Sequence, residues 1–186
     1  MFRQDAAAAM AVHFLKSAPN HELGDLVLMK MMVIAERKCM DQTTSLITGA
    51  DFCSMQNGPV LSDVLDLMKG KDQSTLWSRY IEFVSYAGRN TPSNRCVLKC
   101  DLDEADYLSE FEVELLRSVW NEYGGRDKWS LVNLTHTFPE WDATCAQTKS
   151  SRLIDLKDIF KLGFHEAPDQ ARERAAEIEY FEAVTG

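Results

Sequence analysis

Residues 52–60 have the sequence FCSMQNGPV, in which a short β-prone run leads to a Gly-Pro step and then to aliphatic residues. Gly58 permits a turn that other residues adopt poorly. Pro59 suits the first position of a helix, because its missing N–H would be unbonded there. We therefore predict a short strand over residues 52–55 and a helix over residues 59–68.

A second cluster begins with the run Leu134-Thr135-His136, which ends an apolar-periodic segment and precedes Pro139 and Trp141. A Trp behind a Pro is typical of core filling, because the Pro fixes the chain direction and the indole covers a large apolar area. Neither cluster has the composition of a catalytic centre. Together they indicate an architecture for contact with another protein rather than for chemistry.

His136 allows two interpretations. Its imidazole either hydrogen-bonds a helix end or a backbone carbonyl, or it activates Cys145 or Cys53 as a nucleophile. Nothing in the sequence marks the second arrangement. The chain also contains no phosphate-binding loop, dinucleotide-binding fingerprint, nucleophile elbow or zinc-protease motif. We therefore predict that the protein is not an enzyme and has neither catalytic nor cofactor-binding residues.

Helical periodicity dominates the rest of the chain. Asn20 is placed to cap a helix that is apolar on most sides, and Ser109 with Glu112, and then Asp127, are placed to cap two later helices. Two β-rich runs separated by Gly, Asn and Pro predict a hairpin. The expected helices cover residues 6–18, 22–42, 59–68, 109–123, 127–136, a short stretch from 155, and 168–184, and the expected strands cover 43–47, 52–55, 77–87 and 95–100.

These elements predict a mainly α (α+β) fold, a single helical domain with a small antiparallel β-hairpin element. At 186 residues, with 45% hydrophobic residues, the chain is long enough to bury a core without a disulfide or a metal. We expect one domain over residues 1–165. We expect residues 166–186 to form a C-terminal amphipathic helix that packs on this domain or extends it.

Charge is distributed unevenly along the chain. The net charge is −9, and residues 101–186 carry 9 basic and 19 acidic side chains, whereas residues 1–100 carry 11 basic and 10 acidic ones. Residues 101–114 hold seven acids and no base. Such a field repels phosphate backbones, so we expect no direct binding of nucleic acid. The acidic run is either a solvated face or a surface for a basic partner protein.

The five cysteines do not form a recognisable framework. Their number is odd, no C-x-x-C occurs, and neither a signal peptide nor a long apolar run is present. We expect a cytoplasmic protein that has reduced thiols, makes no membrane contact and has neither a metal site nor a cofactor. The sequence does not determine the oligomeric state.

Taken in order, these motifs resemble the Panacea antitoxin-domain family of bacteria and their phages. The family has a Lys among aliphatics in an early buried helix, then an aromatic-x-x-Met-x-x-Gly-Pro-Val segment, and later a Leu-x-x-Leu-Thr-His helix end followed by Trp. The matching positions in this chain are Leu28-Met29-Lys30-Met31, then Phe52, Met55, Gly58, Pro59 and Val60, then Leu131-Val132-Asn133-Leu134-Thr135-His136 and Trp141. The resemblance covers roughly residues 10–162.

The resemblance implies an antitoxin of a toxin–antitoxin system that binds and neutralises a cognate protein toxin. Some members act instead as adaptors that deliver the toxin to an ATP-dependent protease. The alternative is a phage or mobile-element protein that binds a host factor and has no toxin partner. The residues that we expect to be exposed and to contact the partner are Gln56, Asn57, Glu140, Asp101, Asp103 and Glu104.

Overall fold

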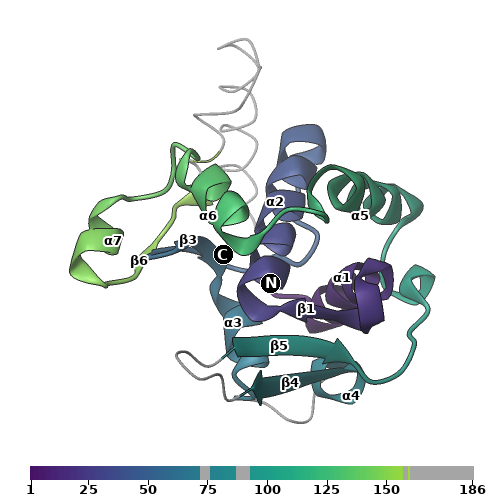
Figure 1. Cartoon of the computed structure of the whole chain (residues 1–186). Coiled ribbons are helices and arrows are strands. Elements are labelled where there is room, and N and C mark those ends of the chain that lie inside the picture. Colours follow the sequence, from purple (N-terminus) through teal and green to yellow (C-terminus); the bar gives the residue numbers. More distant parts are fainter. Residues whose placement is uncertain (72–75, 87–92, 157–158, 160–186) are drawn as a thin grey trace.

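The computed structural model of the chain describes residues 1–71, 76–86, 93–156 and 159 (Figure 1). In chain order its elements are α1 (Gln4–Ser17), η1 (Pro19–His21), β1 (Glu22–Gly24), α2 (Asp25–Thr43), β2 (Phe52–Met55), β3 (Gly58–Leu61), α3 (Ser62–Met68), α4 (Leu76–Tyr80), β4 (Ile81–Tyr86), β5 (Ser93–Leu98), η2 (Glu104–Asp106), α5 (Glu110–Tyr123), α6 (Lys128–His136), α7 (Thr144–Thr148) and β6 (Arg152–Leu153). The mainly helical α+β class is confirmed. The strands form two antiparallel three-stranded sheets rather than one hairpin.

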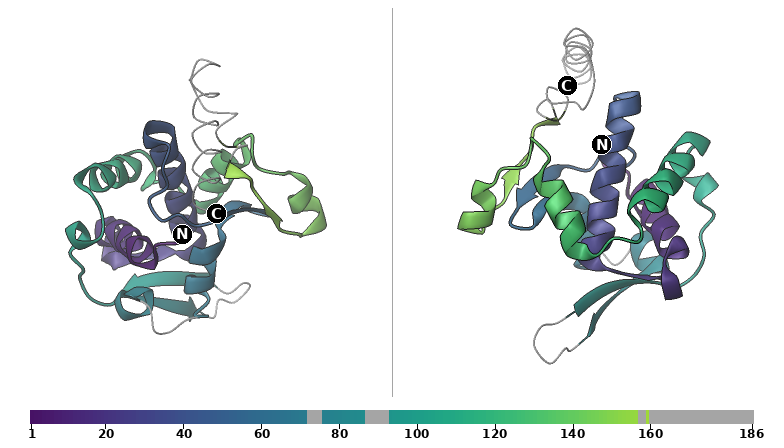
Figure 2. Two further views of the ribbon diagram at one scale, coloured as in Figure 1. Left: turned by 180° about the vertical axis from the view of Figure 1, so that it is seen from behind. Right: turned by 45° about the horizontal axis from the view of Figure 1, so that its top comes forward.

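Helix α2 occupies the centre of the molecule and contacts α1, α5, α6 and β3 (Figure 2). Every residue from Leu28 to Arg37 is buried, which confirms the prediction of a helix that is apolar on most sides. Such burial requires neighbours all round the helix. The central position of α2 therefore brings its few polar side chains into contact with segments that are distant in sequence.

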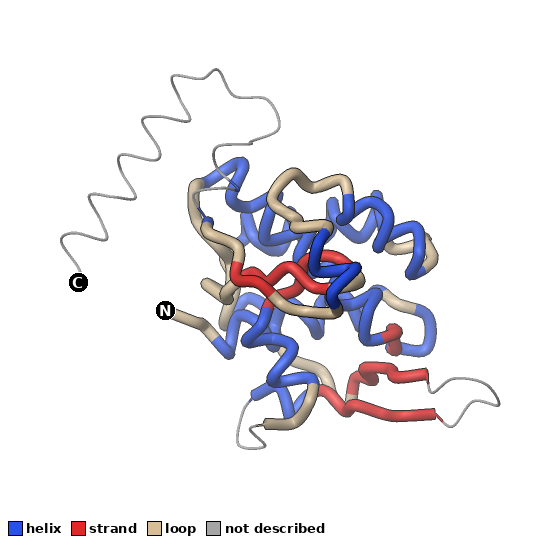
Figure 3. The backbone as a smooth tube through the Cα atoms, turned by 90° about the vertical axis from the view of Figure 1, so that its left-hand side faces the viewer, coloured by secondary structure: helices blue, strands red, loops and turns tan. Residues whose placement is uncertain are grey.

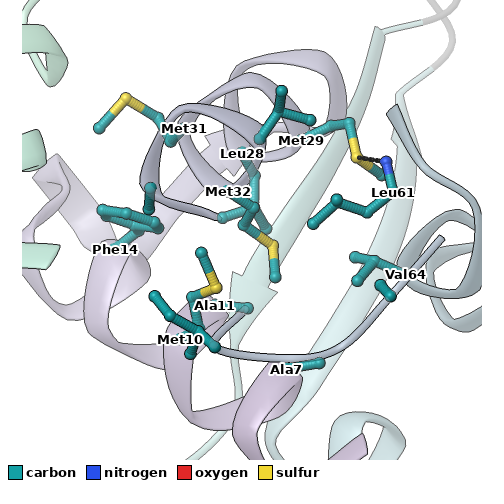
Figure 4. Packing of buried hydrophobic residues seen from close by; sticks show 14 of the residues in the cluster. Ala7, Met10, Ala11, Phe14, Leu28, Met29, Met31, Met32, Leu61 and Val64 are labelled. Carbon is teal, nitrogen blue, oxygen red and sulfur yellow. Dashed lines mark hydrogen bonds between the residues drawn. The ribbon is translucent and has the colours of Figure 1, made fainter. Parts of the chain in front are cut away.

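Helix α1 is buried on all sides from Ala6 to Leu15, although the sequence predicted a helix with only one apolar side. Its alanines leave room for neighbouring elements to approach closely. Met10 and Phe14 belong to the same buried core cluster as Met31 and Met32 of α2 (Figure 4). The amide of Leu61 also donates a hydrogen bond of 3.3 Å to the sulfur of Met29. The methionines of α2 therefore fill the core of the domain.

The first sheet has the strand order β1-β5-β4. Its β4–β5 hairpin confirms the prediction, except that Trp77 lies in the short helix α4. Strand β1 corrects the predicted start of the second helix, because Glu22 pairs with Val97 and α2 begins only at Asp25. Asn20 does not cap that helix. It lies in η1 with a left-handed φ of 56°.

The second sheet has the strand order β3-β2-β6 and corrects the predicted helix start at Pro59. Residues Gly58–Leu61 form strand β3, and the helix starts at Ser62. The pair Met55–Gly58 closes a hairpin in which Gly58 has a φ of +92°. Pro59 is tolerated in β3 because this strand is the edge of its sheet, where a missing N–H disrupts no ladder on the outer side.

Elsewhere in the chain, some predictions from the local sequence are confirmed and others are wrong. Ser109 and Glu112 form the predicted capping box, and Asp127 caps α6 as expected. The predicted strand over residues 43–47 is absent, and Thr44 instead ends α2 in a left-handed conformation. Residues Leu156 and Ile159 are helical, whereas the rest of that helix and the predicted helix over 168–184 lie outside the described residues. None of the described helices is long and apolar enough to cross a membrane.

Candidate functional site

Lys30 lies at the centre of a buried cluster that joins the three sequence motifs. Its side chain is fully buried, and its Nζ donates a hydrogen bond of 2.7 Å to the carbonyl oxygen of Pro59. Burial away from water disfavours the charged form and lowers the pKa of Lys30 to about 7. The lysine of α2 thus holds the Gly-Pro segment against the central helix.

Gly58 lies between the other two motifs. A Cβ at this position would lie 2.7 Å from Oγ1 of Thr135, 2.9 Å from Nζ of Lys30 and 3.1 Å from the His136 ring. Thr135 is fully buried, and its hydroxyl donates to the carbonyl of Val132. The Leu-Thr-His helix end therefore packs directly on the Gly-Pro turn, and only glycine combines this approach with a φ of +92°.

Replacing Gly58 by Ala is expected to lower the free energy of unfolding by about 2–3 kcal/mol, through backbone strain and displacement of Thr135. Urea denaturation checks this value. The control is Gly125→Ala, because a Cβ there meets no atom within 4 Å. If the two variants have the same stability, the Gly58 contacts are not important for the fold.

His136 is held by an aromatic stack. Its ring lies 3.8 Å from the Trp141 ring at an interplanar angle of 5°, and the Trp141 indole donates a hydrogen bond of 3.0 Å to the carbonyl of Met55. Of the two interpretations of His136, the hydrogen bond to a helix end or a carbonyl is not found at Nε2, which is buried and has no partner among the described residues. Burial, and then the charge of Lys30, lower the pKa of His136.

The nucleophile interpretation of His136 gains no geometric support. Cys145 is buried on α7, and no hydrogen bond joins it to His136 within the described part of the chain. Over the same residues, no group of three or more His, Cys, Asp or Glu side chains is arranged to hold a metal ion. The motif cluster is thus a set of packing and hydrogen-bond contacts between α2, β3 and α6.

A buried ion pair lies next to this cluster and was missed by the sequence analysis. Arg37 of α2 pairs with Glu140, and the two side chains are 4% and 1% exposed. The guanidinium also lies 4.4 Å from the centre of the Phe138 ring. The expectation that Glu140 is exposed is therefore wrong, because its carboxylate faces inward to Arg37. A charged residue within the apolar run of α2 was the available signal, since a buried charge requires a partner.

Glu36 is a second buried charge of α2 that the sequence did not mark. Its carboxylate accepts hydrogen bonds from the amides of Ile47 and Thr48 and from the Thr48 hydroxyl. Burial raises the pKa of Glu36, although these hydrogen bonds oppose the shift. The link between α2 and β2 is thereby fixed to the central helix.

The remaining candidate contact residues differ in their exposure. Gln56 and Asn57 are exposed at the tip of the β2–β3 hairpin, and Asp101 and Asp103 are also exposed. Glu104 is only 14% exposed at its side chain, and it binds His13 at 3.0 Å and Lys16 at 3.3 Å. Burial raises the pKa of Glu104, but the partners His13 and Lys16 outweigh it, so that the pKa is lowered. The expectation that Glu104 is exposed is therefore wrong.

Two further surface features are relevant to binding. The exposed acids before and within the first turns of α5 form what we call the acidic surface, consisting of Asp101, Asp103, Asp106, Glu110 and Glu114. A cavity of about 480 Å³ opens between α2, α5 and α6, and it is lined by Ile34, Arg37, Lys38, Asp41, Glu122, Tyr123, Leu134 and Phe138.

Comparison with known families relates this geometry to a function. The family model described as antitoxin SocA-like, Panacea domain, matches residues 28–142. This range begins in α2, before Lys30, and includes the β2–β3 hairpin, the Leu-Thr-His helix end and Trp141. No curated protein and no solved structure matches the chain. The chain belongs to the antitoxin SocA-like, Panacea-domain family.

Proposed function

We propose that this protein is an antitoxin that neutralises a cognate protein toxin by binding it directly. The observation that carries the proposal is the match of the antitoxin-like domain over residues 28–142, which includes all three sequence motifs. The family supports a role related to toxin–antitoxin systems. We further propose that the protein neutralises a protein toxin directly and in the cytoplasm. All five cysteines are free thiols, as a reducing compartment favours.

The buried contacts support binding rather than catalysis. Lys30 binds Pro59, Trp141 binds Met55, and Arg37 binds Glu140, so these polar groups are already engaged inside the domain. A group used in this way stabilises a scaffold and is not free to act on a substrate. Recognition is then left to the exposed residues around the scaffold, which include Gln56 and Asn57 of the hairpin tip.

The acidic surface suits a basic partner. Five exposed carboxylates gather near η2 and the start of α5, and the chain as a whole has a net charge of −9. Complementary charge accelerates diffusional encounter to about 10⁸–10⁹ M⁻¹s⁻¹ at low salt. A toxin with a basic surface would thus be captured quickly, before it reaches its target.

Association with the toxin is expected to slow by about tenfold or more between low salt and about 0.5 M salt, because added ions screen the acidic surface. Stopped-flow mixing measures this rate directly. A double variant, Glu110→Gln with Glu114→Gln, is expected to show a shallower dependence on salt. A rate that does not change with salt would exclude charge steering.

Co-expression tests the proposed function. The product of the adjacent gene is expressed alone and together with this chain, and growth and co-purification are scored. Growth arrest by the neighbour alone, with rescue and a stable complex, is the expected result. Rescue with loss of the toxin and without a complex would indicate a protease adaptor. A harmless neighbour would contradict the proposal and favour a protein that binds a host factor.

A further inference from the structure

Strand β4 is the outer strand of the first sheet. The sheet has the order β1-β5-β4, and over the described residues β4 pairs only with β5 (Figure 3). At six residues, Ile81–Tyr86, β4 is long for an edge strand, and little protects it from pairing with another strand. A strand of this kind presents a row of backbone donors and acceptors to a further strand.

The register shows which backbone groups of β4 point outward. The amide of Lys99 donates to the carbonyl of Tyr80 at 2.8 Å, and the pairing continues without interruption from Ile81–Leu98 to Tyr86–Ser93. Hydrogen-bonded and non-hydrogen-bonded pairs alternate in an antiparallel ladder. The amides and carbonyls of Ile81, Phe83 and Ser85 therefore face the outer edge.

The side chains of β4 do not protect this edge. Natural proteins shield edge strands with charged residues, prolines or bulges. Glu82 is the one charged residue of β4, whereas Phe83 is 40% exposed and Tyr86 is 47% exposed. Two exposed aromatic side chains on an unpaired edge are characteristic of a surface that another protein covers.

A hollow of about 360 Å³ opens beside the start of β4. Its lining combines the apolar side chains of Leu67, Met68, Trp77, Ile81 and Phe83 with Gly70, Ser78, Glu82 and Lys99. A strand that pairs with β4 presents every second side chain to one face. The hollow is therefore placed to accept one apolar side chain of such a strand.

The charges around the hollow define the chemistry of its occupant. Lys99 and Glu82 line the hollow, and Lys69 and Arg79 follow the lining residues Met68 and Ser78 in sequence. Lys69, Arg79 and Lys99 are exposed and form no ion pair with a described residue. Lys99 donates a hydrogen bond of 2.8 Å from its Nζ to the carbonyl of Ser78, which leaves two ammonium protons for another acceptor. This local basic excess contrasts with the net charge of −9 for the whole chain.

We propose that the outer edge of β4 binds an extended segment of the partner protein as an additional strand. An apolar side chain of that segment fills the hollow, and a carboxylate of the segment binds Lys99 or Arg79. The proposal rests on the proposed function, because the partner is the cognate toxin. Pairing between two copies of this chain is disfavoured, since it would bring together two proteins of charge −9 and two identical basic clusters.

A matched pair of variants at Ser85 tests the proposal. Ser85→Pro removes one outward amide and adds a ring at the edge, but it leaves the ladder to β5 intact. Ser85→Ala is the control, because both variants lose the hydrogen bond of 2.7 Å from Ser85 to Asn94. Titration calorimetry with the purified product of the adjacent gene measures affinity, and thermal unfolding confirms that both variants fold.

The expected result is that Ser85→Pro binds at least about tenfold more weakly than Ser85→Ala, which corresponds to about 1.4 kcal/mol. Lys99→Glu is also expected to weaken binding, whereas Lys128→Glu, which changes an exposed charge on α6, is expected to have a smaller effect.

Equal affinity of the two Ser85 variants would overturn the inference about β4 and leave the proposed function standing. If the wild-type chain does not bind, the proposed function fails and the inference fails with it. If the chain forms a dimer that Ser85→Pro dissociates while partner binding is unchanged, the edge of β4 pairs with a second copy of this chain and not with the partner.

Discussion

Replacing Glu140 by Ala is expected to lower the free energy of unfolding by about 3–5 kcal/mol, because the buried guanidinium of Arg37 loses its ion pair with the Glu140 carboxylate. The Arg37 and Glu140 side chains are only 4% and 1% exposed, so water does not replace the lost carboxylate. The two residues are 103 positions apart and connect α2 to the segment that leads to Trp141. The loss is therefore expected to loosen the packing of the whole Leu-Thr-His region.

Urea denaturation of the Glu140→Ala variant measures this effect. Its control is Glu114→Ala, which removes the carboxylate of an exposed ion pair with Arg117 and is expected to cost less than about 1 kcal/mol. A loss of similar size in both variants would mean that the Arg37–Glu140 pair does not hold the fold. Arg37→Met with Glu140→Leu is expected to recover part of the stability, because it removes both buried charges together.

Between about pH 7 and pH 10.5 we expect the stability of the wild type to depend on pH through Lys30, and we expect Lys30→Met to abolish this dependence. The unfolded lysine has an ordinary pKa of 10.5, whereas burial lowers the pKa of the folded residue to about 7. Between these values the unfolded chain binds the proton and the folded chain does not, so folding stability rises with pH. Each pKa unit corresponds to about 1.4 kcal/mol, so the full rise is about 4–5 kcal/mol.

The measurement compares the unfolding free energies of the wild type and Lys30→Met over this pH range, so that other titrations cancel. The difference should shift in favour of the wild type as pH rises. Lys69→Met serves as the control, because it removes an exposed lysine and leaves the buried amine of Lys30 in place. A flat difference for Lys30→Met would show that the buried amine is not neutral in the folded protein.

The parts of the fold that the sequence predicts correctly depend on local interactions. The capping box at Ser109 and Glu112 involves residues three positions apart, and Asp127 caps its own helix. Strand β1 escaped prediction because its partner β5 lies more than 70 residues away and three residues carry little periodicity. Pro59 was assigned to a helix because a proline at a helix start and one on an edge strand have the same local sequence.

In the candidate site, too, local features could be predicted from the sequence, whereas contacts between distant segments could not. The motif positions Gly58, Thr135 and Trp141 could be selected from the sequence, but the contacts that unite them depend on the tertiary structure. Lys30 and Arg37 lie seven positions apart on the buried helix α2, and each meets a partner from a distant segment. Glu140 follows a Pro in a turn-like sequence, which favoured exposure. Only the position of Arg37 in the folded chain shows that the carboxylate points inward.

The most direct test of the central claim uses purified components without protease or nucleotide. The product of the adjacent gene is assayed for its toxic activity while this chain is added in increasing amounts. Direct neutralisation predicts that activity falls to zero as a stoichiometric complex forms and that the toxin stays intact. Full toxin activity at saturating concentrations of this chain would contradict neutralisation by binding.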